Sequence, residues 1–384
     1  MKTYLAAVLV MISALNCLAQ NEEENEQGNL DLRGSIILDH VNNLSGGIKN
    51  GSSMLTLFDL SLSYSFNNGL LKNTSFHTHI LKTAGNSASE NLIGDIQIAS
   101  NIDGYASHFV YELLIKQKIA DFSITAGMHD LNSDFMASEF AGDFINSSFG
   151  ISPVVTLNVP VSVFPITTFG GLLTYDNEAL NIKTGFYNLN HDYVYEESFN
   201  AENHFFQHGF LSVTEIAYRI LNDKSIKGEY KIGGYLKQCD HHQHESLPND
   251  CIEELNYGFY FIGDQTIKEL SGGQHLSAFV QLNFAPQHAN FATEYYGAGL
   301  SLRELSTKWL PDQIGLAIGT VKLNHLLNSG IVKRDKFETV VELTAQIPVF
   351  NYFTIQPDFQ YIINPSGIYN NSFTGLIRLI MELH

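Results

Sequence analysis

The residues with the clearest potential for chemistry lie between two cysteines. Cys239 and Cys251 enclose the segment DHHQHESLPND, which places His241, His242 and His244 close together in the chain. Neutral imidazole is a ligand for zinc, copper and nickel, so this segment could bind such a metal. The simpler interpretation is a polar, exposed loop closed by a Cys239–Cys251 disulfide, the default in an oxidising compartment. We therefore predict the disulfide, and neither a specific metal nor a cofactor.

A second pair of histidines, His77 and His79, falls on one face of a segment with strand periodicity. We interpret this pair as solvated side chains rather than metal ligands. The sequence contains no G-x-S-x-G, no H-E-x-x-H, no phosphate-binding glycine loop and no C-x-x-C. These motifs carry the common nucleophile, metal and phosphate chemistries, so we expect no enzymatic activity.

Composition narrows the classes of protein that these residues can belong to. The 384 residues are 44% hydrophobic and 12% aromatic, which argues against disorder. The formal net charge of -19 argues against nucleic acid, which is bound by basic surfaces. Only 16% of residues are charged, yet no apolar run beyond the N-terminus approaches the ~20 residues of a membrane-spanning helix. A large soluble β protein and a transmembrane β-barrel remain.

The N-terminus indicates export. Residues 1–19 combine an early lysine, a short apolar stretch and a small-x-small site ending at Ala19, as in a secretory signal peptide. Lipidation at Cys17 is the alternative, but Asn16 is bulkier than the small residue expected before a lipidated cysteine. The acidic, apolar-poor residues 20–34 are predicted to form a flexible segment.

Period-2 alternation, the pattern of a β-strand with two different faces, dominates residues 35–384. In the eleven residues 56–66, apolar side chains alternate with Asp and Ser, and a tilted transmembrane strand needs about 9–11 residues. Similar alternation occurs in further segments, including 109–116, where Tyr111, Leu113 and Ile115 share the apolar face, 276–284, 338–347, 353–363 and 373–383. Polar faces poor in Lys and aromatic residues near strand ends favour a transmembrane antiparallel β-barrel over a secreted β-sandwich or propeller.

From about Asp39 onward, the chain resembles the carbohydrate-selective porin (OprB) family of Gram-negative outer membranes. The resemblance is carried, in family order, by DHVNNLSGGIKNG (39–51), NLIGDIQIASNID (91–103), AGMHDLNSDFMASEFAGDFINSSFGISP (126–153), FPITTFGGLLTY (164–175), VVELTAQIPVFNYFTIQPDFQYIINPSG (340–367) and GLIRLIMEL (375–383). It implies a barrel of 16 strands with short periplasmic turns and long extracellular loops. It also implies passive diffusion of mono- or oligosaccharides through a water-filled lumen.

Two features depart from the expected family pattern. The last residue is His384, where many outer-membrane strands end in an aromatic residue, and the acidic excess gives no support of its own to neutral sugars. A general or cation-preferring porin is therefore the alternative function. A secreted β-rich binding protein is the alternative from another class. The sequence leaves open whether the protein is a homotrimer or a monomer in outer-membrane lipid.

The segment from His129 to Gly150 follows a strand and is too long and polar for a tight turn. General porins fold an early loop into the lumen, so we predict a pore constriction here, with an outward surface loop as the alternative. The candidate constriction residues are Asn132, Asp134, Glu139, Asp143 and Asn146.

Inward positions of the predicted strands supply a second set of candidates. Carbonyl, amide and carboxylate groups there could replace water around sugar hydroxyls. For any single residue, an ordinary solvated side chain is the simpler interpretation. The candidate lumen-lining residues are Asp59, Glu112, Glu215, Arg219, Arg303, Gln356, Asp358, Gln360 and Arg378.

Overall fold

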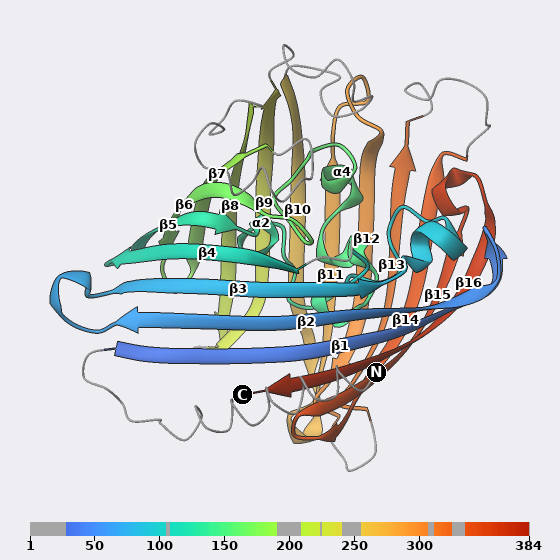
Figure 1. Cartoon of the computed structure of the whole chain (residues 1–384), viewed down its shortest axis with the longest axis horizontal. Helices are drawn as coiled ribbons and strands as arrows, with labels where there is room; N and C mark the ends of the chain where they lie inside the picture. Colours follow the sequence, from blue (N-terminus) through green and yellow to red (C-terminus); the bar gives the residue numbers. More distant parts are fainter. Residues whose placement is uncertain are drawn as a thin grey trace.

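Alternating strands close into a single barrel, as predicted. The computed structural model describes residues 28–104, 108–189, 209–222, 225–239, 255–305, 311–324 and 335–383. Within these residues, sixteen antiparallel strands pair with their neighbours in sequence, and β16 pairs with β1 to complete the ring. Figure 1 shows the first strands in blue lying beside the last ones in red. None of the helices in the described part of the chain is long and apolar enough to span a membrane.

The strands differ in length, from the eight residues of β5 to the twenty of β1. The first eight are β1 (Gly28–Gly47), β2 (Gly51–Phe66), β3 (Thr74–Gly85), β4 (His108–Ile119), β5 (Phe122–His129), β6 (Thr168–Asp176), β7 (Leu180–Asn188) and β8 (Gly209–Asn222). The other eight are β9 (Ser225–Cys239), β10 (Leu255–Glu269), β11 (His275–Phe284), β12 (Ala292–Arg303), β13 (Gln313–Leu323), β14 (Phe337–Phe350), β15 (Phe353–Ile363) and β16 (Asn370–Leu383).

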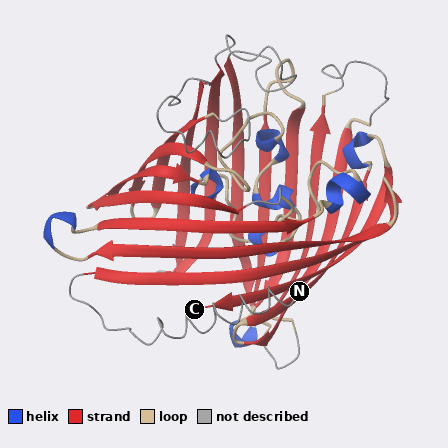
Figure 2. Ribbon diagram, viewed as in Figure 1, coloured by secondary structure: helices blue, strands red, loops and turns tan. Residues whose placement is uncertain are grey.

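The described parts of the connections contain short helical turns and no longer helix. They are η1 (Gly69–Leu71), η2 (Ser89–Ile93), α2 (Leu131–Asp134), η3 (Ala141–Asp143), α3 (Ser147–Gly150), α4 (Pro153–Thr156), η4 (Ser271–Gly273) and η6 (Pro365–Gly367). Figure 2 shows most of these turns in blue within the outline of the barrel, not outside it.

The two faces of the strands differ as the alternation predicts. Apolar side chains on the outer face are exposed, for example Leu113 at 51% and Phe259 at 61%. Inward positions carry polar residues that are buried, such as Glu215 and Asp358. Because only every second residue faces outward, the lipid-facing surface never produces a long apolar run in the sequence.

The barrel begins earlier than predicted. Strand β1 starts at Gly28, so residues 28–34, assigned above to the flexible segment, are part of the barrel. They pair with β2 from Gly28 opposite Phe66 to Gly34 opposite Leu60. The polar composition of this stretch obscured its alternation, in which Leu30 is exposed on the outer face. The predicted signal peptide lies outside the described residues and stays a prediction.

Strand β4 breaks its alternation at one residue. Its pairing with β3 shifts register, so Val110 lies opposite Ile80 and Glu112 lies opposite His79. Tyr111 is the extra residue of this bulge and is buried inside the barrel, with its ring 6.4 Å from that of Phe164. The prediction that Tyr111 shares the outer apolar face was therefore wrong, because a bulge re-aims a side chain that periodicity alone places outward.

Connections of different lengths gather at the two ends of the barrel. One end has tight turns such as 120–121, 177–179 and 351–352. The opposite end includes residues 86–104 and 130–167, which do not remain outside the barrel. Their apolar side chains pack on the inner wall, as where Phe144 and Phe149 lie 5.6 and 5.8 Å from Phe279 of β11. The barrel interior is therefore partly occupied by two inner loops.

Candidate functional site

Loop 130–167 follows the inner wall of the barrel, held there by carboxylates that project inward from the strands. These carboxylates accept backbone N–H groups of the loop. The bonds are Asp130 N to Glu112 at 3.0 Å, Met136 N to Glu215 at 3.0 Å, Glu139 N to Asp264 at 3.1 Å and Ile145 N to Glu342 at 2.6 Å. The acceptors lie on β4, β8, β10 and β14 in turn. Successive parts of the loop are thus attached around much of the wall.

This attachment answers a physical requirement. A loop inside a barrel has no neighbouring strand to pair with, so its backbone N–H groups need other acceptors. Hydrogen bonds to charged acceptors contribute about 1.5–3 kcal/mol each, more than neutral ones. Glu215, Asp264 and Glu342 are all buried, so part of the acidic excess serves to hold the loop.

The loop returns at β11 and β12 and ends again beside β5. Gln281 donates to the Phe149 carbonyl at 2.8 Å, and the Asn158 side chain accepts from Phe291 N at 2.9 Å. Ser162 donates to the His129 carbonyl at 2.7 Å, which brings the end of the loop back to its start.

The other inner loop, of which residues 86–104 are described, covers the wall near the barrel closure. Glu338 of β14 accepts from Gln97 N at 2.9 Å, and Gln360 donates to the Ala99 carbonyl at 2.8 Å. The two loops also bond to each other, with Asn101 N 2.9 Å from the Ile145 carbonyl. The loops therefore support each other as one inner layer.

An arginine of the barrel wall, Arg303, binds the part of loop 130–167 around Glu139 and Asp143. Arg303 Nε donates to Asp143 at 2.8 Å, its Nη1 lies 3.3 Å from Glu139, and its guanidinium lies 4.7 Å from the Phe140 ring centre. Asp143 is buried, whereas the Glu139 side chain is 68% exposed. We call Glu139, Phe140, Asp143 and Arg303 the arginine cluster.

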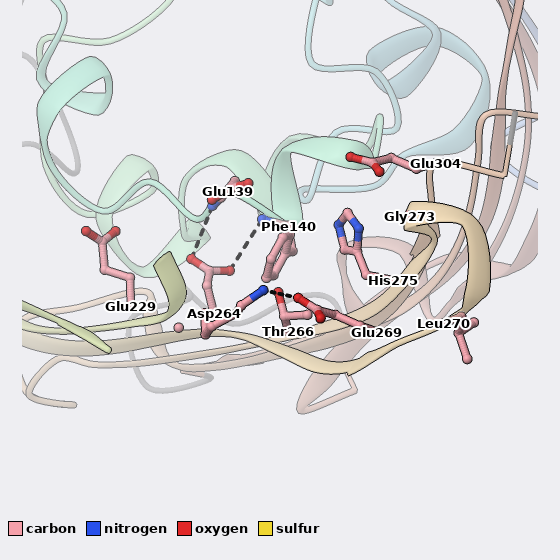
Figure 3. Close-up of a pocket in the computed structure, with 12 residues that line it drawn as sticks. Glu139, Phe140, Glu229, Asp264, Thr266, Glu269, Leu270, Gly273, His275 and Glu304 are labelled. Atoms are coloured by element: carbon pink, nitrogen blue, oxygen red, sulfur yellow. Dashed lines mark hydrogen bonds and ion pairs between the residues drawn. The ribbon is translucent and has the colours of Figure 1, made fainter. Parts of the chain in front are cut away.

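A cavity of about 560 Å³ lies between the arginine cluster and the turn end of β9–β12. Figure 3 shows Glu139 and Phe140 on its loop side, with Asp264 hydrogen-bonded to both backbones. Acidic side chains outnumber basic ones on its lining. The basic residues are His275 and Lys227, and Lys227 is paired with Glu269. The carboxylates that line it are Glu139, Glu229, Asp264, Glu269 and Glu304.

The comparisons with known proteins agree with this architecture. The sequence profile of the carbohydrate-selective porin, OprB, family matches residues 58–379. The chain belongs to this family. It is therefore a passive, sugar-selective channel of the Gram-negative outer membrane, and the alternative of a secreted binding protein is excluded. No curated protein matches the sequence.

Solved structures show the same fold at low sequence identity. The high-pH structure of Pseudomonas putida OprB has a TM-score of 0.81 at 18% identity, covering 93% of this chain and 94% of that one. Its low-pH structure gives 0.59 at 15% identity, covering 93% of each chain. The anion-selective porin from Comamonas acidovorans gives 0.57 at 9% identity, covering 93% of this chain and 100% of that one.

Within this porin, the predicted constriction residues have different surroundings. Asn132 donates to the Phe135 and Gly150 carbonyls at 3.1 and 3.2 Å, which ties two parts of the loop together. Asn146 caps α3 by accepting from Ser148 N at 3.1 Å, and it is buried. With Asp143 also buried, these residues shape the loop rather than offer free groups.

Asp134 is a carboxylate of the loop itself that binds basic side chains of the wall. Its carboxylate lies 2.9 Å from His129 Nε2 and 3.2 Å from Lys183 of β7. Burial alone would raise the pKa of Asp134, but the His129 hydrogen bond and the Lys183 charge outweigh it and hold that pKa below its usual range. Asp134 is therefore an ionised anchor. Three of the predicted constriction residues, Asp134, Glu139 and Asp143, form ion pairs. Of these, Glu139 has the most exposed side chain.

At the start of the loop, Asp130 has a pKa that is shifted upward, in contrast to that of Asp134. Asp130 caps α2 by accepting from Asn132 N at 2.9 Å. Burial, with the nearby negative charge of Glu112 adding to it, raises the pKa of Asp130 to about 6. This group thus changes charge in a mildly acidic medium.

All the predicted lumen-lining residues lie on the inner face of the barrel, but many are not solvated. Ordinary solvated side chains were the simpler interpretation, and it is wrong for the buried members, because these bond to the inner loops or to each other. Asp59, Arg219 and Arg303 are partly exposed and form ion pairs. The buried members are Glu112, Glu215, Gln356, Asp358, Gln360 and Arg378.

The sequence reasoning missed three residues of the site, Asp264, Glu338 and Glu342. Each occupies an inward position of a strand and accepts backbone N–H groups from an inner loop. Strand alternation already placed the two glutamates on the polar face, so an acid at an inward position was the available signal.

The prediction for the cysteine-bounded segment is not tested. Residues 240–254 lie outside the part of the chain that the structure describes, and nothing is described of the Cys239 side chain. The Cys239–Cys251 disulfide and the histidines between them stay predictions.

Proposed function

We propose that the arginine cluster forms the constriction through which sugars pass. The observation that carries this proposal is the exposed Glu139 side chain on a loop segment anchored to β10. Asp264 accepts from Ser138 Oγ at 2.6 Å and from the backbone of Glu139 and Phe140 at 3.1 and 3.3 Å. An exposed group on an anchored backbone can meet each passing solute in the same position.

The chemistry of the cluster suits hydroxyl groups. The Glu139 carboxylate can accept from sugar hydroxyls, and the partly exposed Arg303 guanidinium can donate to them. Such groups replace part of the water around a solute, which allows entry without tight retention. Diffusion of this kind needs no covalent step, so we propose no reaction and no cofactor.

The acidic cavity supports a preference among ions. Because carboxylates outnumber basic groups on its lining, cations and neutral solutes enter it at lower electrostatic cost than anions. This observation favours the cation-preferring alternative as an additional property of the same channel. On the outer face, we propose that lipid covers exposed apolar side chains such as Ile232 and Phe259.

Planar-bilayer recording with the purified porin tests the proposal. Sugars added to the bath should lower the channel conductance. Glu139→Gln should raise the half-blocking sugar concentration by about 3- to 10-fold, because a hydrogen bond to a charged carboxylate is replaced by a weaker one to a neutral amide oxygen. Glu304→Gln, on the lining of the same cavity but on β12's turn, is the matched control.

The outcomes separate the parts of the proposal. A channel that no sugar blocks, with strong cation selectivity, would favour the alternative function. Equal sugar block in the wild type and Glu139→Gln would remove the constriction assignment while leaving the porin itself intact.

A further inference from the structure

A cluster of possible metal ligands lies on the inner wall, away from the arginine cluster. His77 and His79 project from β3, and Glu112 projects from the neighbouring β4, opposite His79 in the strand pairing. One ligand atom from each of these residues lies within 4.8 Å of the others. The sequence interpretation of a merely solvated histidine pair did not foresee this third residue, because it depends on the β3–β4 register.

The spacing of the atoms suits a small tetrahedral ion. Glu112 Oε2 lies 3.5 Å from His77 Nε2 and 3.4 Å from His79 Nδ1. A tetrahedral ion with metal–ligand bonds of about 2.0–2.1 Å keeps its ligand atoms about 3.3–3.4 Å apart. Two of the three distances between ligand atoms are thus already close to the required length, and the third lies within 4.8 Å.

Each ligand is also held by a second partner at its other polar atom. His77 Nδ1 lies 2.8 Å from Ser63 Oγ, and His79 Nε2 lies 2.9 Å from Asp59. The other oxygen of Glu112 accepts from Asp130 N at 3.0 Å. Metal-binding histidines are oriented in this way, with the second ring nitrogen bonded to a carboxylate or hydroxyl.

The cluster is accessible without being fully solvated. The side chains of His77 and Glu112 are 30% and 7% exposed, so one side of the cluster faces the open interior. The Tyr111 ring closes another side, 5.2 Å from that of His79. Two imidazoles with one carboxylate and an open position suit a divalent ion of the zinc, copper or nickel class, whereas magnesium and calcium prefer oxygen ligands.

We propose that His77, His79 and Glu112 bind one divalent transition-metal ion on the inner wall of this porin. The ion would place positive charge beside Asp59 and Glu112, in an otherwise acidic channel. The proposal is independent of the constriction assignment, because none of these residues belongs to the arginine cluster.

Calorimetric titration of the full chain in detergent with Zn²⁺ tests the proposal. It is run at about pH 8, since a metal must displace any proton from the imidazole rings. The background variant is His241→Asn/His242→Asn/His244→Asn. It removes the histidines between Cys239 and Cys251, so that they cannot contribute to Zn²⁺ binding. This background should still bind one Zn²⁺ per chain, and adding His77→Asn/His79→Asn should weaken binding by at least about 100-fold. Equal binding in the two variants would overturn the proposal.

A second measurement needs no change at the site. X-ray absorption of the Zn²⁺-loaded background variant should show two imidazole ligands per zinc, with the remaining ligands oxygen. A zinc environment with oxygen ligands only would overturn the proposal even if the His77→Asn/His79→Asn protein failed to fold.

The matched control for the titration is His275→Asn in the same background, a change on the lining of the acidic cavity. This variant should bind Zn²⁺ as the background does.

Discussion

Removal of the Asp264 carboxylate should release the constriction segment while leaving the barrel in place. Asp264 is buried on β10 and accepts from Ser138, Glu139 and Phe140 of the inner loop. In Asp264→Ala all of these bonds are lost. In Asp264→Asn one side-chain oxygen can still accept, but the amide group places a donor against a backbone donor.

The size of the effect follows from these bonds. At about 1.5–3 kcal/mol for each hydrogen bond to a charged acceptor, and because neighbouring bonds are not additive, Asp264→Ala should destabilise the local segment by about 3–5 kcal/mol. The rest of the loop keeps its attachments to Glu215 and Glu342. We therefore expect residues 138–140 to fluctuate without the loop leaving the lumen.

Single-channel recording measures this fluctuation directly. The open-channel current of Asp264→Ala should show added noise and weaker sugar block, with Asp264→Asn intermediate between it and the wild type. Glu269→Ala is the control, since Glu269 lines the same cavity on the same strand and pairs with Lys227 instead of the loop. Heat-modifiable gel migration would verify the folded barrel. Wild-type noise and sugar block in Asp264→Ala would refute the anchoring argument.

Two further predictions concern stability. Burial raises the pKa of Asp130 to about 6. Above that pH the ionised Asp130 lowers the free energy of unfolding, and this destabilisation disappears as the pH falls towards 4. Asp130→Asn, which keeps the cap of α2, should be more stable than the wild type at about pH 8, by at most about 3 kcal/mol, and equal to it near pH 4, as measured by the temperature of heat-modifiable unfolding. At the barrel closure, Arg378 Nε donates to buried Asp39 at 2.8 Å. Arg378→Ala should cost about 3–5 kcal/mol in urea unfolding by leaving that charge unpaired, and adding Asp39→Ala should restore part of it; equal loss in both variants would contradict this reasoning.

The barrel could be predicted because its signal is local. In residues 353–363, the alternation of Ile355 and Phe359 with Gln356 and Asp358 already assigns each side chain to a face, and the structure confirms it. The prediction failed where a local rule was broken, at the bulge of Tyr111. It also failed where composition hid the alternation, at residues 28–34.

The site could be predicted only in part, because its contacts join residues far apart in the chain. Alternation shows that Glu342 points inward, but not that the N–H groups of Ile145 and Asn146 lie against it. For the same reason, Asp143 and Glu139 looked equivalent in sequence. One is buried against Arg303, and the other projects into the cavity.

The acidic residues of this porin therefore fall into two groups with different roles. Carboxyl groups such as those of Glu215 and Glu342 are buried and accept backbone N–H groups of the inner loop, so they do not face a passing solute. Carboxylates such as Glu139 and Glu304 line the open cavity, where their field acts on whatever enters. Neutralising one of the first kind should alter loop order, and neutralising one of the second kind should alter ion preference. Net charge alone cannot separate these effects, because it counts both kinds equally.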